Sequence, residues 1–355
     1  MKVGILSMQK VINFGSFLQA YALKKIIQEL GHSVSFVDIR QGREVVSLNS
    51  KGVRKQKYIV DKYIFKRIEH VFFSRRRRAN FKKKYFEFAD INHSVPESQC
   101  DIIVIGSDEV FNCCQPAKWG FSLQLLGETE RPAISYAGSF GYSDYDKICT
   151  MDMENEAACS LRKLKEISVR DVNSADCINK LIGKHPHQHL DPVLIYDWSA
   201  EITPQNKYDN YILVYSYDNR INDEKEIRAI KDFARKYGKK LISFGLYQRW
   251  CDKNVACSPF ELIAYFDSAD YVITDTFHGT VISIKRNKKF ATIIRDSNYN
   301  KLSDLMRKMG VWDRRIEHID DLECVIQKEI MFEPINCLIS EECERSIAYL
   351  RENLI

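Results

Sequence analysis

The chain alternates short, strongly hydrophobic segments with amphipathic ones, and this pattern constrains its fold more than any other feature. Residues 2–7 (KVGILS) are typical of a buried strand, apolar residues recur at helical spacing from Ser16 to Leu30, and residues 33–39 (SVSFVDI) are again typical of a strand. A strand, a helix and a second strand of these lengths indicate parallel strands joined by a right-handed crossover.

The same alternation continues in two successive sets, which predicts an α/β protein with two Rossmann-like domains, each built on a parallel sheet. The further strands are expected at 101–106, 133–137, 167–169 and 187–190 in the first set, and at 211–217, 240–244, 271–274 and 290–294 in the second. Helices are expected near 153–165, 174–182, 222–237, 259–268, 279–286, 299–309 and 340–354.

The two sets are separated by residues 199–209, which are polar, contain a proline and are predicted to form a linker. We therefore predict an N-terminal Rossmann-like domain at 1–198, a C-terminal Rossmann-like domain at 210–338 and a final helix within 339–355. A length of 355 residues fits two domains. A basic insertion at about 40–90 interrupts the first domain.

Composition excludes several classes of protein. The chain is 45% apolar and contains 19 Phe, 18 Tyr and 4 Trp, so it can bury a large core and is not disordered throughout. No apolar run approaches the ~18 residues of a membrane-spanning helix, and the first residues are too short for a signal peptide, so we expect a cytoplasmic protein. The 11 cysteines include no CxxC pair, and we expect reduced thiols and no metal site.

Residues 40–84 carry an unusual positive charge. They contain 16 Lys and Arg against three Asp and Glu, a net charge of +13 in a chain whose total is +5. Aromatic residues are interleaved with the runs Arg75–Arg78 and Lys82–Lys84, which indicates an amphipathic helix with a cationic face. Such a face suits anionic lipid headgroups or nucleic acid. A solvated helical insertion is the simpler alternative.

Small polar residues lie at the ends of the predicted strands 2–7, 101–106 and 133–137, where ligands bind in doubly wound folds. Asn13, Gly15 and Ser16 open a helix, and a helix N-terminus can bind an anion. The same residues are also ordinary helix caps. Gly106 with Ser107, and Ser139 after the next strand, permit close approach of a ligand to the backbone, although they also suit tight turns. No GxGxxG motif follows the first strand, which argues against a nicotinamide enzyme.

Charged and titratable residues occupy two further strand ends. Arg170 follows a short strand, and its guanidinium can bind a carboxylate or phosphate through two hydrogen bonds or can pair with Asp171. His278 follows the strand 271–274 at the start of a helix, close in sequence to Asp275. Histidine serves as acid or base near neutral pH, and a structural histidine is the alternative.

Together these loops resemble the polysaccharide pyruvyl transferase family. The segment VGILSMQKVINFGSFLQAYALKKIIQELGHSVSFVD and the blocks VIGSDEVFN, ISYAGSFG, ISVRD, LDPVL and VITDTFHGTVISI occur in the family's order between about residues 2 and 310. The resemblance implies two halves arranged as in GT-B glycosyltransferases, an active site in the cleft, and a C-terminal helix at 339–355 that packs back towards the N-terminal domain.

The resemblance also implies a reaction that needs no cofactor. Phosphoenolpyruvate would be the donor, and a sugar of a surface glycan, such as an exopolysaccharide or capsule, would be the acceptor. The product would be a pyruvate ketal. A lipid-linked acceptor would bring the enzyme to the inner face of the membrane, with peripheral contact through residues 40–84.

Residue roles follow from the same resemblance. Arg170 would hold the donor's carboxylate or phosphate and His278 would be the catalytic acid, while Asp108 or Asp275 would accept the sugar hydroxyl proton. The substrate contacts would come from Asn13, Gly15, Ser16, Gly106, Ser107, Ser139, Thr276, Gly279 and Thr280. Some members read T-D-R-L-H-G where this chain has Thr276, which lacks the guanidinium charge. Lys10 and Arg295 are candidates to supply it.

Two other functions fit parts of the pattern. A GT-B-type glycosyltransferase would use a nucleotide sugar in the same architecture. A non-enzymatic nucleic-acid-binding protein would use the basic segment and would bind with steep salt dependence. The acidic remainder of the chain argues against the second, and we expect no nucleic-acid partner.

Overall fold

The computed structural model describes residues 1–45, 64–114, 120–205, 207–218 and 220–355. The chain divides into two compact units. Unit 1 consists of Met1–Ile64, Phe86–Pro192 and Glu342–Ile355, and unit 2 consists of Phe65–Tyr85 and Val193–Glu341.

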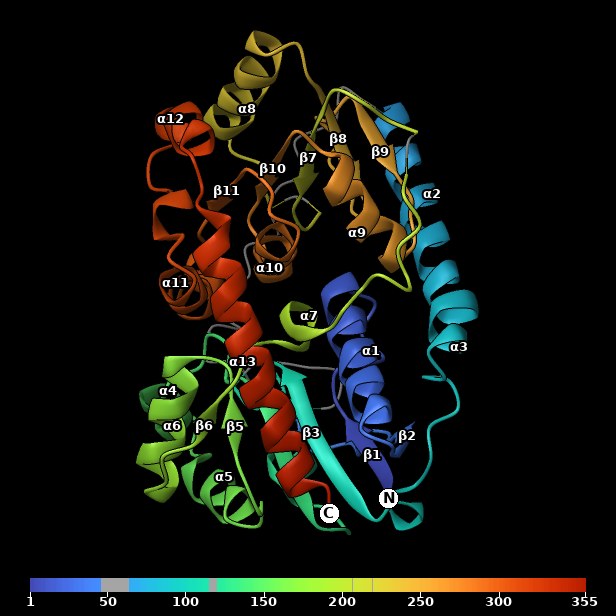
Figure 1. The fold of residues 1–355 in the computed structure, drawn as a ribbon, viewed down its shortest axis with the longest axis vertical. Helices are drawn as coiled ribbons and strands as arrows, with labels where there is room; N and C mark the ends of the chain where they lie inside the picture. The colour runs from blue at the N-terminus through green and yellow to red at the C-terminus, as the bar shows by residue number, and fades with distance from the viewer. Residues whose placement is uncertain (46–63, 115–119, 206, 219) are drawn as a thin grey trace. The chain divides into compact units, whose positions relative to one another are not determined.

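Unit 1 is built on a six-stranded parallel sheet (Figure 1). Its strands are β1 (Lys2–Leu6), β2 (Ser33–Phe36), β3 (Ile102–Asp108), β4 (Ala133–Gly138), β5 (Ser168–Val169) and β6 (His187–Gln188), in the order β2-β1-β3-β4-β5-β6. The chain leaves β1 for β2 on one side and then returns to β3 on the other. The topological switch point, where ligands bind in such sheets, therefore lies between β1 and β3.

Both faces of this sheet are buried, which explains the continuous hydrophobic runs of its strands. Ile103 and Ile105 of β3 join one core cluster, and Val104 between them is equally buried on the opposite face. Each such side chain contributes about 2 kcal/mol on burial. The flanking helices are α1 (Phe14–Glu29), α3 (Phe86–Phe88), α4 (Tyr145–Thr150), α5 (Glu154–Leu161) and α6 (Val172–Ile182).

Unit 2 repeats the plan with a second six-stranded parallel sheet. Its strands are β7 (Tyr211–Tyr215), β8 (Lys240–Phe244), β9 (Lys253–Val255), β10 (Tyr271–Thr274), β11 (Phe290–Ile293) and β12 (Arg315–Ile316), in the order β12-β11-β10-β7-β8-β9. The switch point here lies between β7 and β10. The helices are α8 (Glu224–Lys236), α9 (Pro259–Ser268), α10 (Phe277–Lys285), α11 (Tyr299–Lys308) and α12 (Leu322–Gln327), after the short α7 (Pro192–Ile195).

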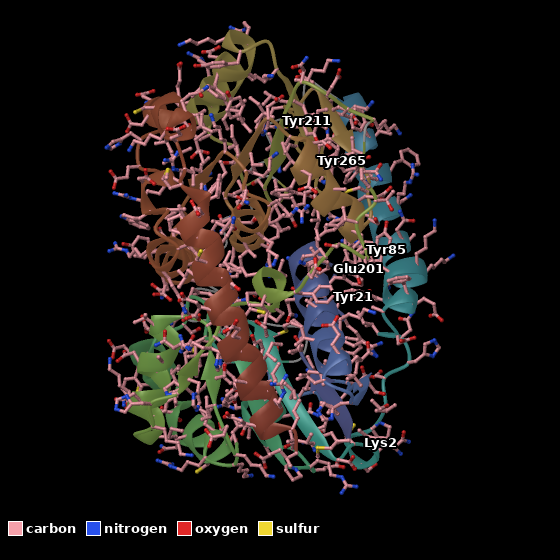
Figure 2. The ribbon with its side chains drawn as sticks, viewed as in Figure 1. Lys2, Tyr21, Tyr85, Glu201, Tyr211 and Tyr265 are labelled. Carbon is pink, nitrogen blue, oxygen red and sulfur yellow. The ribbon has the colours of Figure 1, made fainter. Side chains whose placement is uncertain are left out.

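Aromatic packing closes the core of unit 2 between β7 and α9. The buried Tyr211 hydroxyl donates to the carbonyl of Tyr265 at 2.6 Å, so a polar group inside the core keeps a partner. Figure 2 labels both residues in this unit. The ring of Tyr265 also stacks on Phe244 with centroids 4.2 Å apart.

The prediction of two Rossmann-like domains with parallel sheets is confirmed. Every predicted strand has a counterpart in the structure, whereas β9 and β12 were not predicted. These two strands have three and two residues, too few for a period of two to stand out.

The observed units divide the chain differently from the predicted domains. The helix α2 (Ile64–Asn80) and the π-helical turn Phe81–Tyr85 group with unit 2 from Phe65 onwards, although the insertion at 40–90 was expected within the first domain. The later crossing falls between Pro192 and Val193, ahead of the expected linker at 199–209. The part of residues 40–84 at 46–63 lies outside the described residues.

The last helix, α13 (Phe332–Asn353), contributes its residues from Glu342 onwards to unit 1. There the Tyr349 hydroxyl donates to the carbonyl of Ser135 at 2.8 Å, and the Tyr349 ring packs on His189 with centroids 4.7 Å apart. No helix in the described part of the chain combines the length and apolar character needed to span a bilayer.

Candidate functional site

A carboxylate stands at the switch point of unit 1. Asp108 ends β3, and its Oδ2 accepts a 2.7 Å hydrogen bond from the hydroxyl of Ser16, which lies at the start of α1 after β1. Its Oδ1 accepts from Arg170 Nη2 at 3.3 Å. The loops after β1, β3 and β5 therefore converge on one carboxylate, because parallel strands bring their carboxyl ends to one edge.

The backbone around Asp108 is unusual. Asp108 has φ of 74°, a left-handed conformation that costs a non-glycine residue about 1–3 kcal/mol and is concentrated at functional sites. Gly106 has φ of 135°, and a Cβ there would meet the carbonyl oxygen of Tyr136 at 2.0 Å, so only glycine fits. Ser107 between them is fully buried and donates to the Ala137 carbonyl at 2.9 Å. The strand end is thus built to present the Asp108 carboxylate.

Arg170 is held by two carboxylates and is almost fully buried. Its Nη1 donates to Asp191 Oδ2 at 2.6 Å, and only 2% of its side chain is exposed. Burial alone would lower the pKa of Arg170, but the charges of Asp191 and Asp108 hold it above its ordinary value. The guanidinium therefore stays charged and orients Asp108. The expected role of Arg170 in binding the donor stays a prediction.

Side-chain caps engage backbone N–H groups at the helix starts of unit 1. Asn13 caps α1, and its Oδ1 accepts from the N–H groups of Gly15 at 2.7 Å and Ser16 at 3.3 Å. Both N–H groups expected to bind an anion are therefore engaged by the cap. Ser139 donates to Asp171 Oδ2 at 2.6 Å, and Asp171 in turn caps α6.

Unit 2 places a buried carboxylate beside two arginines at its own switch point. Asp275 directly follows β10 and is 0% exposed. Its Oδ2 lies 3.5 Å from Arg220 Nε, in the loop after β7, and 3.6 Å from Arg295 Nε, after β11. Burial raises the pKa of Asp275, and the two arginines oppose that rise. Arg295 also donates both Nη groups to Glu226, at 2.7 and 2.8 Å.

The turn between β10 and α10 positions His278. Thr276 caps α10 by accepting from the Gly279 N–H at 2.9 Å, and a Cβ on Gly279 would meet Thr274 Oγ1 at 2.1 Å. Thr280 is fully buried and donates to the Thr276 carbonyl at 3.1 Å. These residues fix the first turn of α10, in which His278 is the second residue. His278 is 7% exposed, and its ring meets the Phe277 ring edge-on at 5.2 Å.

Sequence reasoning missed two members of these clusters. These are Asp191, which the resemblance includes only as part of the LDPVL block, and Arg220, which lies in none of the quoted blocks. A signal for Asp191 was present, because it follows a predicted strand and lies in the LDPVL block. Arg220 lies five residues beyond the end of β7 and carries no motif. Within the described residues, no group of three or more His, Cys, Asp and Glu side chains is placed to hold a metal ion.

Solved structures share the fold at low identity. The S. aureus MnaA–UDP co-structure is 12% identical and aligns over 100% of this chain and 96% of its own, with a TM-score of 0.51. The Methanocaldococcus jannaschii UDP-GlcNAc 2-epimerase in complex with UDP-GlcNAc and UDP is 12% identical over 98% of this chain and 100% of its own, with a TM-score of 0.50. These likenesses show the fold alone, a two-domain Rossmann-like fold. No curated protein matches the chain.

A family model extends the comparison to sequence. The model for polysaccharide pyruvyl transferase matches residues 13–297, which is most of the chain. The matched range contains Asp108 and Arg170 of unit 1 and Asp275 and His278 of unit 2. The chain is therefore a transferase that belongs to the polysaccharide pyruvyl transferase family.

Proposed function

We propose that this transferase moves the enolpyruvyl unit of phosphoenolpyruvate onto a sugar of a surface glycan, forming a pyruvate ketal. The observation that carries the proposal is that the family match spans both polar clusters. Each cluster offers groups that the reaction needs: a carboxylate held by an arginine in unit 1, and two arginines beside Asp275 in unit 2, which also contains His278.

The reaction balances without a cofactor. A proton adds to the donor's methylene carbon, one sugar hydroxyl attacks the adjacent carbon, and the C–O bond to phosphate breaks. A second hydroxyl of the same sugar then attacks the same carbon and closes the ketal. Of the two hydroxyl protons released, one replaces the proton that went to the new methyl group and the other leaves with phosphate. The enzyme therefore needs an acid, a base and cations for the phosphate.

We assign the acid to His278 and the base to Asp108. Asp108 suits a base better than Asp275 because its side chain is 13% exposed, whereas that of Asp275 is 0% exposed. Burial also raises the pKa of Asp275, which disfavours its ionised form. Arg170 and Ser16 act through Asp108 by fixing its two oxygens.

The donor carries close to three negative charges near neutral pH and needs cations that Thr276 does not provide. We propose Arg220 as the main cation, with Arg295 beside it. Arg220 donates one Nη to Ser297 at 2.5 Å, and its side chain is 23% exposed. Arg295 is 25% exposed but is bound on both Nη groups by Glu226. Lys10 already pairs with Asp38 at 2.5 Å.

The direct test supplies the purified protein with phosphoenolpyruvate and glycan acceptors. We expect phosphate release together with a new ketal methyl signal in the NMR spectrum of the glycan. Thermal-shift measurements should show stabilisation by phosphoenolpyruvate, about 2.7 kcal/mol at 100 times its Kd. The fold relatives MnaA and UDP-GlcNAc 2-epimerase were solved with UDP, which makes a nucleotide-sugar glycosyltransferase the second candidate. Stabilisation by nucleotide sugars and none by phosphoenolpyruvate would favour that candidate.

Replacing Asp108 by Asn tests the base. We expect turnover to fall by roughly 100-fold or more, the usual scale for general base catalysis, with little change in melting temperature. Asp191→Asn is the matched control, because Asp191 pairs with the same Arg170 but is only 1% exposed. The control should lower the melting temperature more than it lowers the activity of the folded fraction. Full activity in Asp108→Asn would show that Asp108 is not the base.

Replacing Arg220 by Met tests the donor cation. Hydrogen bonds to a charged group contribute about 1.5–3 kcal/mol, so the KM for phosphoenolpyruvate should rise about 10-fold or more while the KM for the acceptor stays constant. Lys10→Met removes an equal charge from unit 1 and should leave both constants unchanged. An unchanged KM for phosphoenolpyruvate in Arg220→Met would show that Arg220 does not bind the donor's phosphate.

We also propose that the acceptor is a lipid-linked glycan of exopolysaccharide or capsule synthesis. The enzyme would then work in the cytoplasm at the inner face of the membrane.

A further inference from the structure

One face of α2 packs against the rest of unit 2. His70, Phe73, Arg77 and Phe81 recur at spacings of three and four residues and therefore lie along one side of the helix. The rings of His70 and Phe73 pack on Tyr247, with centroids 4.7 and 5.6 Å away, and Phe81 is fully buried.

Polar contacts reinforce this anchored face. The Asp218 carboxylate lies 3.1 Å from His70 Nε2 and accepts from both Nη groups of Arg77 at 3.4 Å. Burial would raise the pKa of Asp218, but the hydrogen bond with His70 and the charge of Arg77 hold it below its ordinary value. Beyond the helix, the Tyr85 hydroxyl donates to the Cys257 carbonyl at 3.3 Å. Figure 2 labels Tyr85. The helix is thus held in one orientation.

The opposite face of α2 combines exposed apolar and cationic side chains. Ile68, Val71 and Phe72 are 48%, 44% and 64% exposed. Arg75 and Arg76 follow at helical spacing and are also exposed, as are Arg78, Lys82, Lys83 and Lys84. Neither Arg75 nor Arg76 forms an ion pair anywhere in the described chain. We call Ile68, Val71, Phe72, Arg75 and Arg76 the outer face of α2.

We propose that the outer face of α2 docks unit 2 onto an anionic lipid bilayer. Apolar side chains beside unneutralised cations match the boundary between acyl chains and anionic headgroups. Nucleic acid would also attract the arginines, but its phosphates offer no partner to Ile68 and Val71. Charge complementarity and the aliphatic pair therefore both favour a membrane.

This inference rests on the proposed function only for the reason why the protein would dock, because docking would bring the enzyme to a lipid-linked acceptor. Binding itself is a property of α2 and is measured without substrate. None of the residues of the outer face belongs to the clusters assigned to catalysis or donor binding.

Vesicle sedimentation with the full chain tests the proposal. Vesicles of phosphatidylcholine alone are compared with an equal mixture of phosphatidylcholine and phosphatidylglycerol, at rising salt. We expect binding to the anionic vesicles only, fading as salt screens the charges. Arg75→Ser with Arg76→Ser should lower the partition coefficient about 25-fold, at about fivefold for each basic residue. Phe72→Ser should weaken binding at every salt concentration.

A charge-matched control separates location from net charge. Lys225→Ser with Arg228→Ser removes two exposed cations from α8 of the same unit and should leave binding close to that of the unaltered chain. Equal loss in this control, or equal binding to neutral vesicles, would overturn the proposal. Tighter binding to duplex DNA or RNA than to anionic vesicles, unaffected by Ile68→Ser, would overturn it in favour of nucleic acid.

Activity distinguishes this proposal from the proposed function. Transfer to a water-soluble oligosaccharide acceptor should be unchanged in Arg75→Ser with Arg76→Ser, with an unchanged melting temperature. Vesicle binding without any pyruvyl transfer by the unaltered chain would contradict the proposed function but would still support membrane docking through the outer face of α2.

Discussion

Replacing His278 by Ala is expected to lower turnover with phosphoenolpyruvate by roughly 100-fold or more. The donor's methylene carbon needs a proton before the sugar hydroxyl can attack, and general acid catalysis contributes on this scale. His278 lies in the first turn of α10, which is fixed by the Thr276 cap and by the close contact at Gly279. The measurement is turnover at saturating donor and acceptor, with the melting temperature of each variant.

Two further variants distinguish a loss of proton donation from a loss of side-chain packing. His278→Gln keeps a hydrogen-bonding side chain but cannot act as an acid, so it should lose activity like His278→Ala. His189→Gln is the matched control, since His189 is 4% exposed and its Nδ1 lies 2.8 Å from the Ser168 hydroxyl in unit 1. It should lower the melting temperature while the folded fraction stays active. Full activity in both His278 variants, or a fall in melting temperature that accounts for the lost activity, would make His278 a structural residue.

The fold was predictable where burial dictates the pattern. The run IIVI at the start of β3 is buried on both faces, so it is hydrophobic at every position and predicts a strand of a parallel sheet. The same reasoning failed for the placement of α2. His70 and Asp218 are 148 positions apart in sequence, and no local pattern indicates that one anchors to the other. The basic residues predicted the helix but not the unit to which it belongs.

The candidate site was predictable as a set of positions but not as a set of contacts. The strand ends indicated Asp108 and Arg170 separately, because ligands and polar residues gather at that edge of a parallel sheet. Their mutual ion pair depends on the packing of β3 against β4 and of β4 against β5, which the sequence does not display. Gly15 and Ser16 were correctly placed at a helix start, yet the side chain of Asn13 engages their N–H groups.

The polar clusters of the two units have opposite arrangements of charge. In unit 1 an arginine lies between two carboxylates, Asp108 and Asp191, and in unit 2 a carboxylate lies between two arginines, Arg220 and Arg295. The first leaves a partly exposed carboxylate suited to accept a proton. The second leaves partly exposed cations suited to bind phosphate. A ketal-forming transferase needs both, and the contrast therefore agrees with the proposed reaction.

Replacing Arg170 by Met is expected to destabilise the protein by about 3–5 kcal/mol, because breaking a buried ion pair leaves an uncompensated charge. That charge is on Asp191, which is 1% exposed and lies 2.6 Å from Arg170. Urea denaturation measures the loss. Adding Asp191→Asn to Arg170→Met removes the stranded charge and should recover part of the stability. Arg170→Met that is no less stable than the unaltered chain would contradict the importance of this pair.

The same variants decide whether Arg170 positions Asp108 or binds the donor. Without the nearby cation the pKa of Asp108 should rise, because a positive charge favours the ionised carboxylate. A base must be ionised to accept a proton, so the acidic limb of the kcat profile should move to higher pH in Arg170→Met, which removes the cation and keeps the carboxylate of Asp191. Arg170→Lys keeps the charge without the two-pronged geometry and should shift the limb less. A positioning role predicts a fall in kcat with nearly constant KM for phosphoenolpyruvate. A large rise in that KM with an unmoved pH profile would instead place Arg170 on the donor.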